Sequence, residues 1–480
     1  MNLLFVASEC APFIKTGGLA DVIGAVPKSL AEAGVGVKVL IPAYPALAAL
    51  VAGGETVVSF DNLFGGPGRV VAVQAEGLDI LLLEAAHLYN RPGNIYLGPN
   101  GQDWPDNGLR FAALSFAGAH IAQHGLGAWR PDVVNAHDWQ AGLVPVYLRQ
   151  SGAQTPPVVM TIHNIAFQGL FDASQMTALG LHSTLFTPSG YEYFGKIGFL
   201  KAGLALAEKI TTVSPTYATE LLTPEFGMGL DGLLRARQQD LVGILNGIDL
   251  DIWSPGADPY LVSPYSTRSL KGKAANRAEV ETRFGLVPGN GPLFCVISRL
   301  TSQKGLDMLL ECLPVLVGQG GRLAVLGSGD PALERAFIDA SARYSGAVGT
   351  IIGYDEPLSH LLQGGSDAIL IPSRFEPCGL TQLYGLQYGT LPVVARTGGL
   401  ADTIIDANAA ALLANCATGI QFTPINSTML GNAIARACAL YKQPKIWEAM
   451  MRRAMRHPVG WDLSAMAYLN VYRAAVEGHA

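Results

Sequence analysis

Short apolar runs alternate with longer stretches of helical periodicity along the whole chain. The apolar runs lack a period of two, so they predict strands that are buried on both faces of a parallel sheet. The predicted strands are residues 3–7, 37–41, 80–83, 133–135, 158–162, 293–297, 323–326, 368–371 and 392–395. Between them, stretches such as 306–317 carry leucines on one helical face, with Pro314 as a possible kink. This alternation predicts the α/β fold class.

The chain predicts two domains, because 480 residues exceed the usual size of one. The sequence TGGLAD occurs at 16–21 and again at 397–402, each time after a cation and before a helical pattern. We interpret this repeat as two doubly wound halves with a cleft between them. The first domain is predicted to span 1–243, and the second to begin at 244.

Composition narrows the classes of function. Hydrophobic residues make up 49% of the chain and charged residues 15%, with a net charge of −6, which argues against nucleic acid or an anionic membrane as partner. No apolar run reaches the roughly 20 residues of a membrane span, and the first residues lack the pattern of a signal peptide. Six scattered cysteines without a CxxC pair predict reduced thiols. We therefore expect a soluble, cytoplasmic protein.

The segment from Lys15 to Asp21 is the first candidate for chemistry. Gly17 and Gly18 let the backbone approach a ligand closely, and the following helix directs N–H groups and partial positive charge at it. With the charge of Lys15, this combination suits a diphosphate. The alternative is an ordinary strand–helix turn with a surface lysine.

Two further groups follow strands of the second half. Arg299 and Lys304 come after strand 293–297 and suit phosphate oxygens; the alternative is solvated surface charge. After strand 368–371, a helix is expected to begin near Gly379, so that the N–H groups of Gly379, Leu380 and Thr381 meet a phosphate. Glu376 would hold sugar hydroxyls beside it, or else cap a helix. We expect Cys378 to belong to this substrate-binding loop and to pack in it, without a catalytic role.

Polar residues also follow two strands of the first half. His137 and Asp138 come after strand 133–135, and His163 comes after strand 158–162. The alternative for each histidine is a structural role. No GxSxG elbow occurs, and metal-ligand spacing is absent at these positions, so we expect neither a catalytic metal nor a cofactor. Cations and helix ends would then stabilise a leaving phosphate.

Nine motifs together resemble one family, the bacterial glycogen synthases and plant starch synthases. They are KTGGLADV at 15–22, AHDWQ at 136–140, TIHNIAFQG at 161–169, EFGMGLDG at 225–232, NGID at 246–249, SRLTSQKG at 298–305, GYDEPLSH at 353–360, SRFEPCGLTQ at 373–382 and RTGGLADT at 396–403. Each motif alone is weakly specific, but their shared order makes the resemblance specific. Two departures are minor: Asn135 stands where a histidine is expected, and Ser302 occupies a variable position.

The resemblance implies a GT-B glycosyltransferase, with two Rossmann-like domains facing a deep interdomain cleft. It implies retaining transfer of glucose from ADP-glucose to glycogen or another α-1,4-glucan, with release of ADP. The resemblance also implies residue roles. Lys15, Gly17 and Gly18 would meet the diphosphate and the glucose of the donor, and the diphosphate would also contact Arg299, Lys304, Leu380 and Thr381. Glucose would be bound by His163, Asn246 and Glu376, adenine would stack on Tyr354, and Asp138 would lie at the donor–acceptor junction. The resemblance further implies that the second domain ends at 456 and that the segment 457–480 returns to the first domain.

Three alternatives stay open at the level of sequence. A related retaining GT-B enzyme would use UDP-glucose. A phosphorylase would require a lysine that carries pyridoxal phosphate and would absorb visible light. A glucan-binding scaffold without catalysis would release no nucleotide, although the joint presence of Lys15, His163, Arg299, Lys304 and Glu376 argues against it.

Overall fold

The computed structural model describes residues 1–479, and the chain forms two compact units. The N-terminal unit contains Met1–Asn246 and the C-terminal helix that begins at Trp461. The C-terminal unit contains Gly247–Gly460. The chain therefore crosses between the units at Asn246–Gly247 and Gly460–Trp461, against the 243–244 and 456–457 expected from sequence.

The N-terminal unit is built on a nine-stranded sheet of order β12-β11-β7-β6-β1-β2-β5-β4-β3. Its strands are β1 Asn2–Val6, β2 Gly36–Pro42, β3 Glu55–Phe60, β4 Gly68–Ala75, β5 Leu78–Glu84, β6 Val133–His137, β7 Val158–Ile162, β11 Lys209–Thr212 and β12 Leu241–Gly243. A small separate sheet contains β8 Leu170–Asp172, β9 Glu192–Tyr193 and β10 Lys196–Gly198. The five strands predicted for this half are confirmed.

The order of these strands reverses between β1 and β6. From β1 the chain proceeds through β2 and β5 on one side, and then returns to build β6, β7, β11 and β12 on the other. Ligands of doubly wound sheets bind at the carboxyl ends of the strands where this reversal occurs. The loops after β1 and β6 are therefore the expected site in this unit.

The expectation of parallel strands is wrong at one edge of this sheet. β3 and β4 run antiparallel, and β4 also pairs antiparallel with β5. Glu76 and Gly77 both have positive φ, of 51° and 75°, in the connection from β4 to β5, which is typical of a tight hairpin turn. β3 is an exposed edge strand, so its side chains do not show the apolar run of a buried parallel strand.

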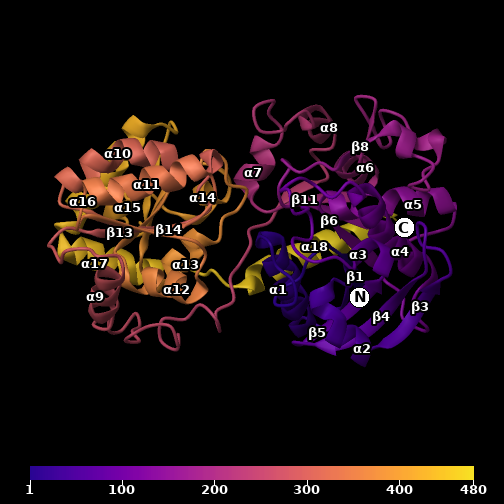
Figure 1. Cartoon of the computed structure of the whole chain (residues 1–480), viewed down its shortest axis with the longest axis horizontal. Coiled ribbons are helices and arrows are strands. Elements are labelled where there is room, and N and C mark those ends of the chain that lie inside the picture. The colour runs from indigo at the N-terminus through magenta and orange to yellow at the C-terminus, as the bar shows by residue number, and fades with distance from the viewer. Residues whose placement is uncertain (480) are drawn as a thin grey trace. The chain divides into compact units, whose positions relative to one another are not determined.

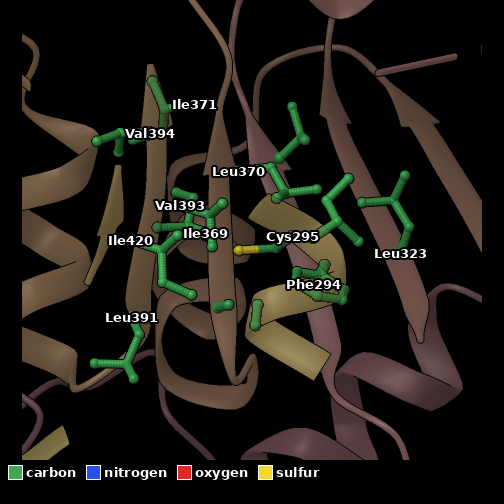
Figure 2. Close-up of a cluster of buried hydrophobic side chains, with 14 of the residues drawn as sticks. Phe294, Cys295, Leu323, Ile369, Leu370, Ile371, Leu391, Val393, Val394 and Ile420 are labelled. Atoms are coloured by element: carbon green, nitrogen blue, oxygen red, sulfur yellow. The ribbon is translucent and has the colours of Figure 1, made fainter. Parts of the chain in front are cut away.

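The C-terminal unit has a six-stranded parallel sheet of order β15-β14-β13-β16-β17-β18. Its strands are β13 Leu293–Ile297, β14 Arg322–Gly327, β15 Val348–Ile352, β16 Ala368–Ile371, β17 Leu391–Ala395 and β18 Ile420–Phe422. The four strands predicted for this half are confirmed. Figure 2 shows their buried apolar side chains, with Cys295 of β13 beside Ile369 of β16, its partner in register. Here the strand order reverses between β13 and β16.

Helices cover both sheets. In the N-terminal unit they are α1 Gly18–Glu32, α2 Ala48–Gly53, α3 Ala86–Tyr89, α4 Asn107–His124, α5 Val144–Ser151, α6 Phe199–Leu206, α7 Pro215–Glu220, α8 Asp231–Ala236 and α18 Trp461–His479. In the C-terminal unit they are α9 Lys273–Arg283, α10 Leu306–Gly318, α11 Pro331–Arg343, α12 Glu356–Gly365, α13 Thr381–Tyr388, α14 Gly398–Thr403, α15 Ala409–Leu413, α16 Ser427–Tyr441 and α17 Pro444–Ala454. In Figure 1, α10 and α11 lie on one side of the C-terminal sheet, and α12 and α13 lie on the other.

The C-terminal helix α18 belongs to the core of the N-terminal unit. It packs against α1, and Figure 1 shows it in yellow among indigo and purple elements. Trp461, Tyr468 and Tyr472 are buried in the same apolar cluster as Leu3 and Phe5 of β1. Within residues 1–479, every helix is too short or too polar to cross a lipid bilayer.

Candidate active site

A buried carboxylate organises the Gly-rich loop after β1. Glu9 is 3% exposed, and its Oε2 accepts hydrogen bonds from the backbone N–H of Thr16 at 2.5 Å and of Gly17 at 3.3 Å. The Tyr96 hydroxyl donates to Glu9 Oε1 at 2.9 Å. Burial raises the pKa of Glu9, and the hydrogen bonds from Thr16, Tyr96 and Gly17 oppose that shift. Sequence reasoning missed Glu9, although an acidic residue close to the end of a predicted strand was a usable signal.

The loop that Glu9 holds presents Lys15 and the start of α1. Lys15 Nζ lies 2.7 Å from Asp21 Oδ1, with 47% of its side chain exposed. α1 begins at Gly18. Its N-cap residue is Gly17, which has no side chain and so makes no side-chain capping hydrogen bond. A β-carbon at Gly17 or Gly18 would have no atom within 4 Å, so the space in front of both glycines is open. This geometry suits an anion at the helix N-terminus.

The second TGGLAD segment uses its glycines differently. It opens α14, but a β-carbon at Gly398 would lie 1.9 Å from the carbonyl oxygen of Glu376, and one at Gly399 would lie 2.3 Å from that of Cys378. Gly399 N also donates to the Glu376 carbonyl at 3.2 Å. These glycines therefore allow close backbone packing behind residues 376–378, whereas Gly17 and Gly18 leave space for a ligand.

Asp138 and His163 meet at the ends of the adjacent strands β6 and β7. Asp138 has the uncommon φ of 53°, and its Oδ1 accepts a hydrogen bond from the backbone N–H of His163 at 2.7 Å. Burial raises the pKa of Asp138 to about 7, against the lowering effect of hydrogen bonds from the backbones of His163 and Asn164. Burial also lowers the pKa of His163 to about 3, so its imidazole is neutral at pH 7.

Asn246 is the last residue of the N-terminal unit. It is buried, and its side-chain Oδ1 has no hydrogen-bond partner within the described residues 1–479. A buried acceptor without a partner is costly unless a ligand supplies a donor. Within residues 1–479, the structure shows no hydrogen bond between Asn246 and the other residues expected in the site.

In the C-terminal unit, the loops after β13 and β16 are joined by an ion pair. Lys304 Nζ lies 2.5 Å from Glu376 Oε2, and Ser373 Oγ donates to the same oxygen at 2.9 Å. A β-carbon at Gly305 would lie 2.0 Å from the Pro372 carbonyl oxygen, so glycine permits this close approach. The Arg299 side chain is exposed in the first of these loops, without a hydrogen-bond partner in residues 1–479.

The loop after β16 ends at the N-terminus of α13. This helix begins at Thr381 with Leu380 as N-cap, slightly later than the expected start near Gly379, because Gly379 takes a left-handed conformation with φ of 74°. The N-cap supplies no side-chain hydrogen bond. Cys378 is buried, and its carbonyl accepts a hydrogen bond from Gln382 Nε2 at 3.0 Å. The N–H groups at the start of α13 are thus left without a side-chain cap.

Tyr354 lies just before α12, with 75% of its surface exposed. Its hydroxyl donates to Glu356 Oε2 at 3.3 Å. An exposed ring of this kind offers a face for stacking. No cluster of three or more histidine, cysteine, aspartate or glutamate side chains that suits a metal ion occurs in the described part of the chain.

Most of the expected residues thus lie in loops around the reversal point of the sheet in their own unit, whereas Asn246 and Tyr354 follow the edge strands β12 and β15. In the N-terminal unit, Lys15, Gly17 and Gly18 share one loop, and Asp138 contacts His163. In the C-terminal unit, the ion pair of Lys304 and Glu376 joins the loops after β13 and β16, and the second of these loops leads to the N-terminus of α13. In each unit, cations and a helix start without a side-chain cap suit a phosphate group.

Family models match both units. Residues 2–236 match the starch synthase catalytic domain, and residues 279–453 match the glycosyl transferases group 1. Among solved structures, the catalytic domain of starch synthase IV from Arabidopsis thaliana, bound to ADP and acarbose, aligns with a TM-score of 0.86 at 29% identity over 99% of both chains. Sucrose-phosphate synthase from Thermosynechococcus elongatus shares the fold, with a TM-score of 0.58 and 16% identity over 99% of both chains.

The fold and the matched families define a glycosyltransferase of the GT-B class. Glycogen synthase from Roseobacter denitrificans is 65% identical over 479 residues, covering 100% of both chains. Glycogen synthase from Paracoccus denitrificans is 56% identical over 473 residues, covering 98% of this chain and 99% of its own. The chain belongs to the bacterial glycogen synthase family, which confirms the resemblance in its motifs.

Proposed function

We propose that this enzyme transfers glucose from ADP-glucose to the non-reducing end of an α-1,4-glucan such as glycogen, with release of ADP and retention of configuration. The observation that carries the proposal is the likeness to glycogen synthases over the full length of the chain. The ADP bound in the Arabidopsis starch synthase structure supports an adenine nucleotide as donor. The polar groups at the two strand reversals would supply the chemistry that such a reaction needs.

The donor diphosphate would bind to cations and helix starts. Lys15 and Arg299 have exposed side chains in loops that follow strands at the two reversal points. Lys304 adds a third cation, and the uncapped N-termini of α1 and α13 add partial positive charge, with Leu380 and Thr381 at the start of α13. The open space at Gly17 and Gly18 would admit the phosphates or the glucose close to the backbone.

The transferred glucose would be held by His163, Asn246 and Glu376. Each has a buried polar group, and the unpartnered Oδ1 of Asn246 is suited to accept from a hydroxyl. Glu376 Oε2 accepts from Ser373 and Lys304, and the carboxylate is a strong acceptor for sugar hydroxyls. Tyr354 would stack on adenine, and Asp138 would lie near the junction of donor and acceptor.

Retention without a covalent glucosyl intermediate fits these residues best. A double displacement needs a free carboxylate about 5 Å from its acid partner, close to the anomeric carbon. Asp138 accepts from the backbone at His163, and Glu376 is paired with Lys304, so neither is an evident nucleophile. We therefore propose a reaction on one face of the sugar, in which the departing phosphate takes the proton of the acceptor hydroxyl and the cations stabilise its charge.

The division of labour between the units is part of this proposal. The N-terminal unit would bind the glucan acceptor, and the C-terminal unit would bind most of the nucleotide sugar. We propose small-molecule and glucan partners in the cytoplasm, without nucleic acid or membrane.

One assay tests the function. The full chain is incubated with glycogen and either ADP-glucose or UDP-glucose, and nucleoside diphosphate release and new α-1,4 linkages are both measured. We expect release with ADP-glucose that depends on glycogen, and loss of it in Lys304→Met. A preference for UDP-glucose would show that UDP-glucose is the donor. Release of nucleoside diphosphate without glycogen would indicate hydrolysis of the donor. No release would favour a glucan-binding scaffold without catalysis. Visible absorbance of a bound cofactor would instead indicate a phosphorylase.

A further inference from the structure

A second histidine lies beneath the candidate site. His137 is the last residue of β6, with none of its surface exposed, and its ring packs against Phe5 with 5.1 Å between ring centroids. Its Nδ1 lies 3.0 Å from Nε2 of His163, within hydrogen-bond distance. Its other nitrogen, Nε2, is buried without a partner within residues 1–479.

One proton lies between these two rings. Burial lowers the pKa of His137 well below its usual value, with the nearby His163 adding to the shift, and burial also lowers the pKa of His163. Both imidazoles are therefore neutral at pH 7, and each carries a single N–H. Because two neutral rings form one N–H···N bond, either His137 Nδ1 or His163 Nε2 must be the donor.

The unpartnered nitrogen decides between the two arrangements. If His163 Nε2 were the donor, His137 would carry its proton on Nε2, as a buried N–H group without an acceptor. If His137 Nδ1 is the donor, His137 Nε2 is a bare lone pair instead. Buried N–H groups without a partner are rarer in folded proteins than under-satisfied acceptors, so the second arrangement is favoured.

The remaining nitrogen of His163 then follows. With Nε2 accepting from His137, the single proton of His163 lies on Nδ1. This atom makes no hydrogen bond within residues 1–479 and is not among the fully buried atoms without a partner. The backbone of His163 is already held by Asp138 Oδ1 at 2.7 Å, so the contact with His137 orients the ring and selects its tautomer.

We propose that His137 is a positioning residue that holds His163 as an Nδ1–H donor toward an oxygen of the transferred sugar. The proposal rests on the proposed function, because it takes a sugar as the ligand of His163. A metal-bound histidine is oriented by a similar partner on its second nitrogen. Here the partner is another neutral histidine, and the ligand is a hydroxyl.

The tautomer can be read directly. The full chain labelled with ¹⁵N-histidine is studied by long-range ¹H–¹⁵N correlation at pH 7, and the spectrum of His163 is assigned by comparison with His163→Gln. We expect His163 to carry its proton on Nδ1 and His137 to do the same. A proton on His163 Nε2 in the wild-type chain overturns the proposal, whether or not the enzyme is active.

Three variants separate positioning from packing. His137→Leu removes the donor, His137→Asn keeps an N–H near the place of Nδ1, and His120→Leu makes the same change on α4, away from the site. In His137→Leu we expect kcat/KM for ADP-glucose to fall about tenfold, the loss expected for one hydrogen bond. The Kd of ADP should stay unchanged, because ADP lacks the glucosyl group that His163 would contact. His137→Asn should keep the Nδ1–H form of His163 and recover most of the loss.

The outcomes discriminate clearly. Unchanged kcat/KM in His137→Leu, or an equal loss in His137→Asn and His137→Leu, contradicts positioning through the hydrogen bond. Melting temperatures are measured for all variants, and if His137→Leu does not fold, His137→Asn and the wild-type tautomer still decide. If the wild-type chain transfers glucose from neither nucleotide sugar while the proton of His163 lies on Nδ1, the proposed function is wrong. The assignment of the tautomer to the contact with His137 would still hold.

Discussion

Glu376 and Lys304 show how one contact serves two parts of the proposed reaction. The carboxylate is suited to sugar hydroxyls and the ammonium to phosphate, yet they lie 2.5 Å apart, with 9% and 18% of their side chains exposed. Each neutralises the other before substrate binds, which lowers the cost of keeping both charges partly buried. Their pairing also places the two loops after β13 and β16 in one arrangement.

Glu376→Ala is expected to separate chemistry from nucleotide binding. Turnover should fall severely, because the glucosyl group loses its orientation as positive charge develops on the ring. Affinity for ADP should be unchanged or slightly tighter, since Lys304 is released to the phosphates. Initial rates and calorimetric titration with ADP test this, with Asp339→Ala on the exposed side of α11 as control. Near-normal turnover would leave Glu376 as a structural acid, and a collapse of ADP binding would contradict its separate role.

Lys15→Gln is expected to weaken the use of ADP-glucose and to leave glycogen affinity nearly unchanged. A charge-assisted hydrogen bond contributes about 1.5–3 kcal/mol, which corresponds to a loss on the order of tenfold to a hundredfold in kcat/KM for the donor. The exposed pair with Asp21 is easily exchanged for a phosphate. Lys28→Gln on the following helix, α1, is the matched control. Equal kinetics in both variants would return Lys15 to an ordinary surface lysine.

The buried Lys273 connects several elements of the C-terminal unit. From the start of α9, its Nζ lies 3.1 Å from the Gly364 carbonyl oxygen at the end of α12 and 2.8 Å from Thr390 Oγ1 before β17. It also lies 3.3 Å from the Tyr388 carbonyl oxygen at the end of α13. One side chain therefore satisfies acceptors on both helices that flank the loop of Glu376.

Lys273→Met is expected to destabilise the C-terminal unit by about 3 kcal/mol, because buried acceptors lose their donor at about 1–3 kcal/mol each. Scanning calorimetry tests this, with the exposed Lys271→Met as control. A melting temperature equal to that of the control would show that the contacts contribute nothing net.

The pH dependence of stability has a defined sign at Lys273. Burial lowers its pKa to about 7, with Asp367 opposing, whereas an unfolded lysine has a pKa of about 10.4. Between these values the unfolded chain binds more protons, so the free energy of unfolding should rise with pH from about 7 to about 10.4. It should fall as the pH decreases toward about 7. Denaturant titrations of wild type and Lys273→Met should show that this slope is reduced in the variant.

Asn135, which stands where the family pattern has a histidine, makes hydrogen bonds to two other elements. Its Oδ1 accepts a hydrogen bond from Tyr472 of α18 at 2.7 Å. Its Nδ2 donates to the Val159 carbonyl at 3.0 Å and to Thr161 Oγ1 at 2.8 Å, both on β7. The residue, on β6, therefore connects the C-terminal helix to β7, the strand that precedes His163.

For the whole enzyme, glucose transfer is expected to persist in excess EDTA. The proposed countercharges for the leaving diphosphate are Lys15, Arg299, Lys304 and the starts of α1 and α13, which no chelator removes. ADP release is measured after dialysis against EDTA and after Mg²⁺ or Mn²⁺ is restored. Abolition by the chelator with recovery on adding metal would contradict transfer without a metal ion.

Periodicity alone was sufficient for the central strands of both units, because β1, β7, β13 and β16 are apolar on both faces. It was insufficient for the edge strand β3 and its neighbour β4, whose mixed exposure resembles that of a loop. The resemblance in the motifs named the family correctly because those motifs occur in the same order over the whole chain. The resemblance assigned a role to each site residue separately, and these roles stay predictions.

Sequence by itself therefore determined the α/β class, the central strands, the family and the loops in which chemistry was expected. Only the tertiary structure decided which distant residues touch: Glu9 with Thr16 and Tyr96, Lys304 with Glu376, and His137 with His163. The identical TGGLAD segments illustrate the reason. Their local sequence is the same, but open space faces Gly17 and backbone faces Gly398, because the neighbours of a loop are set by the order of strands in the folded sheet.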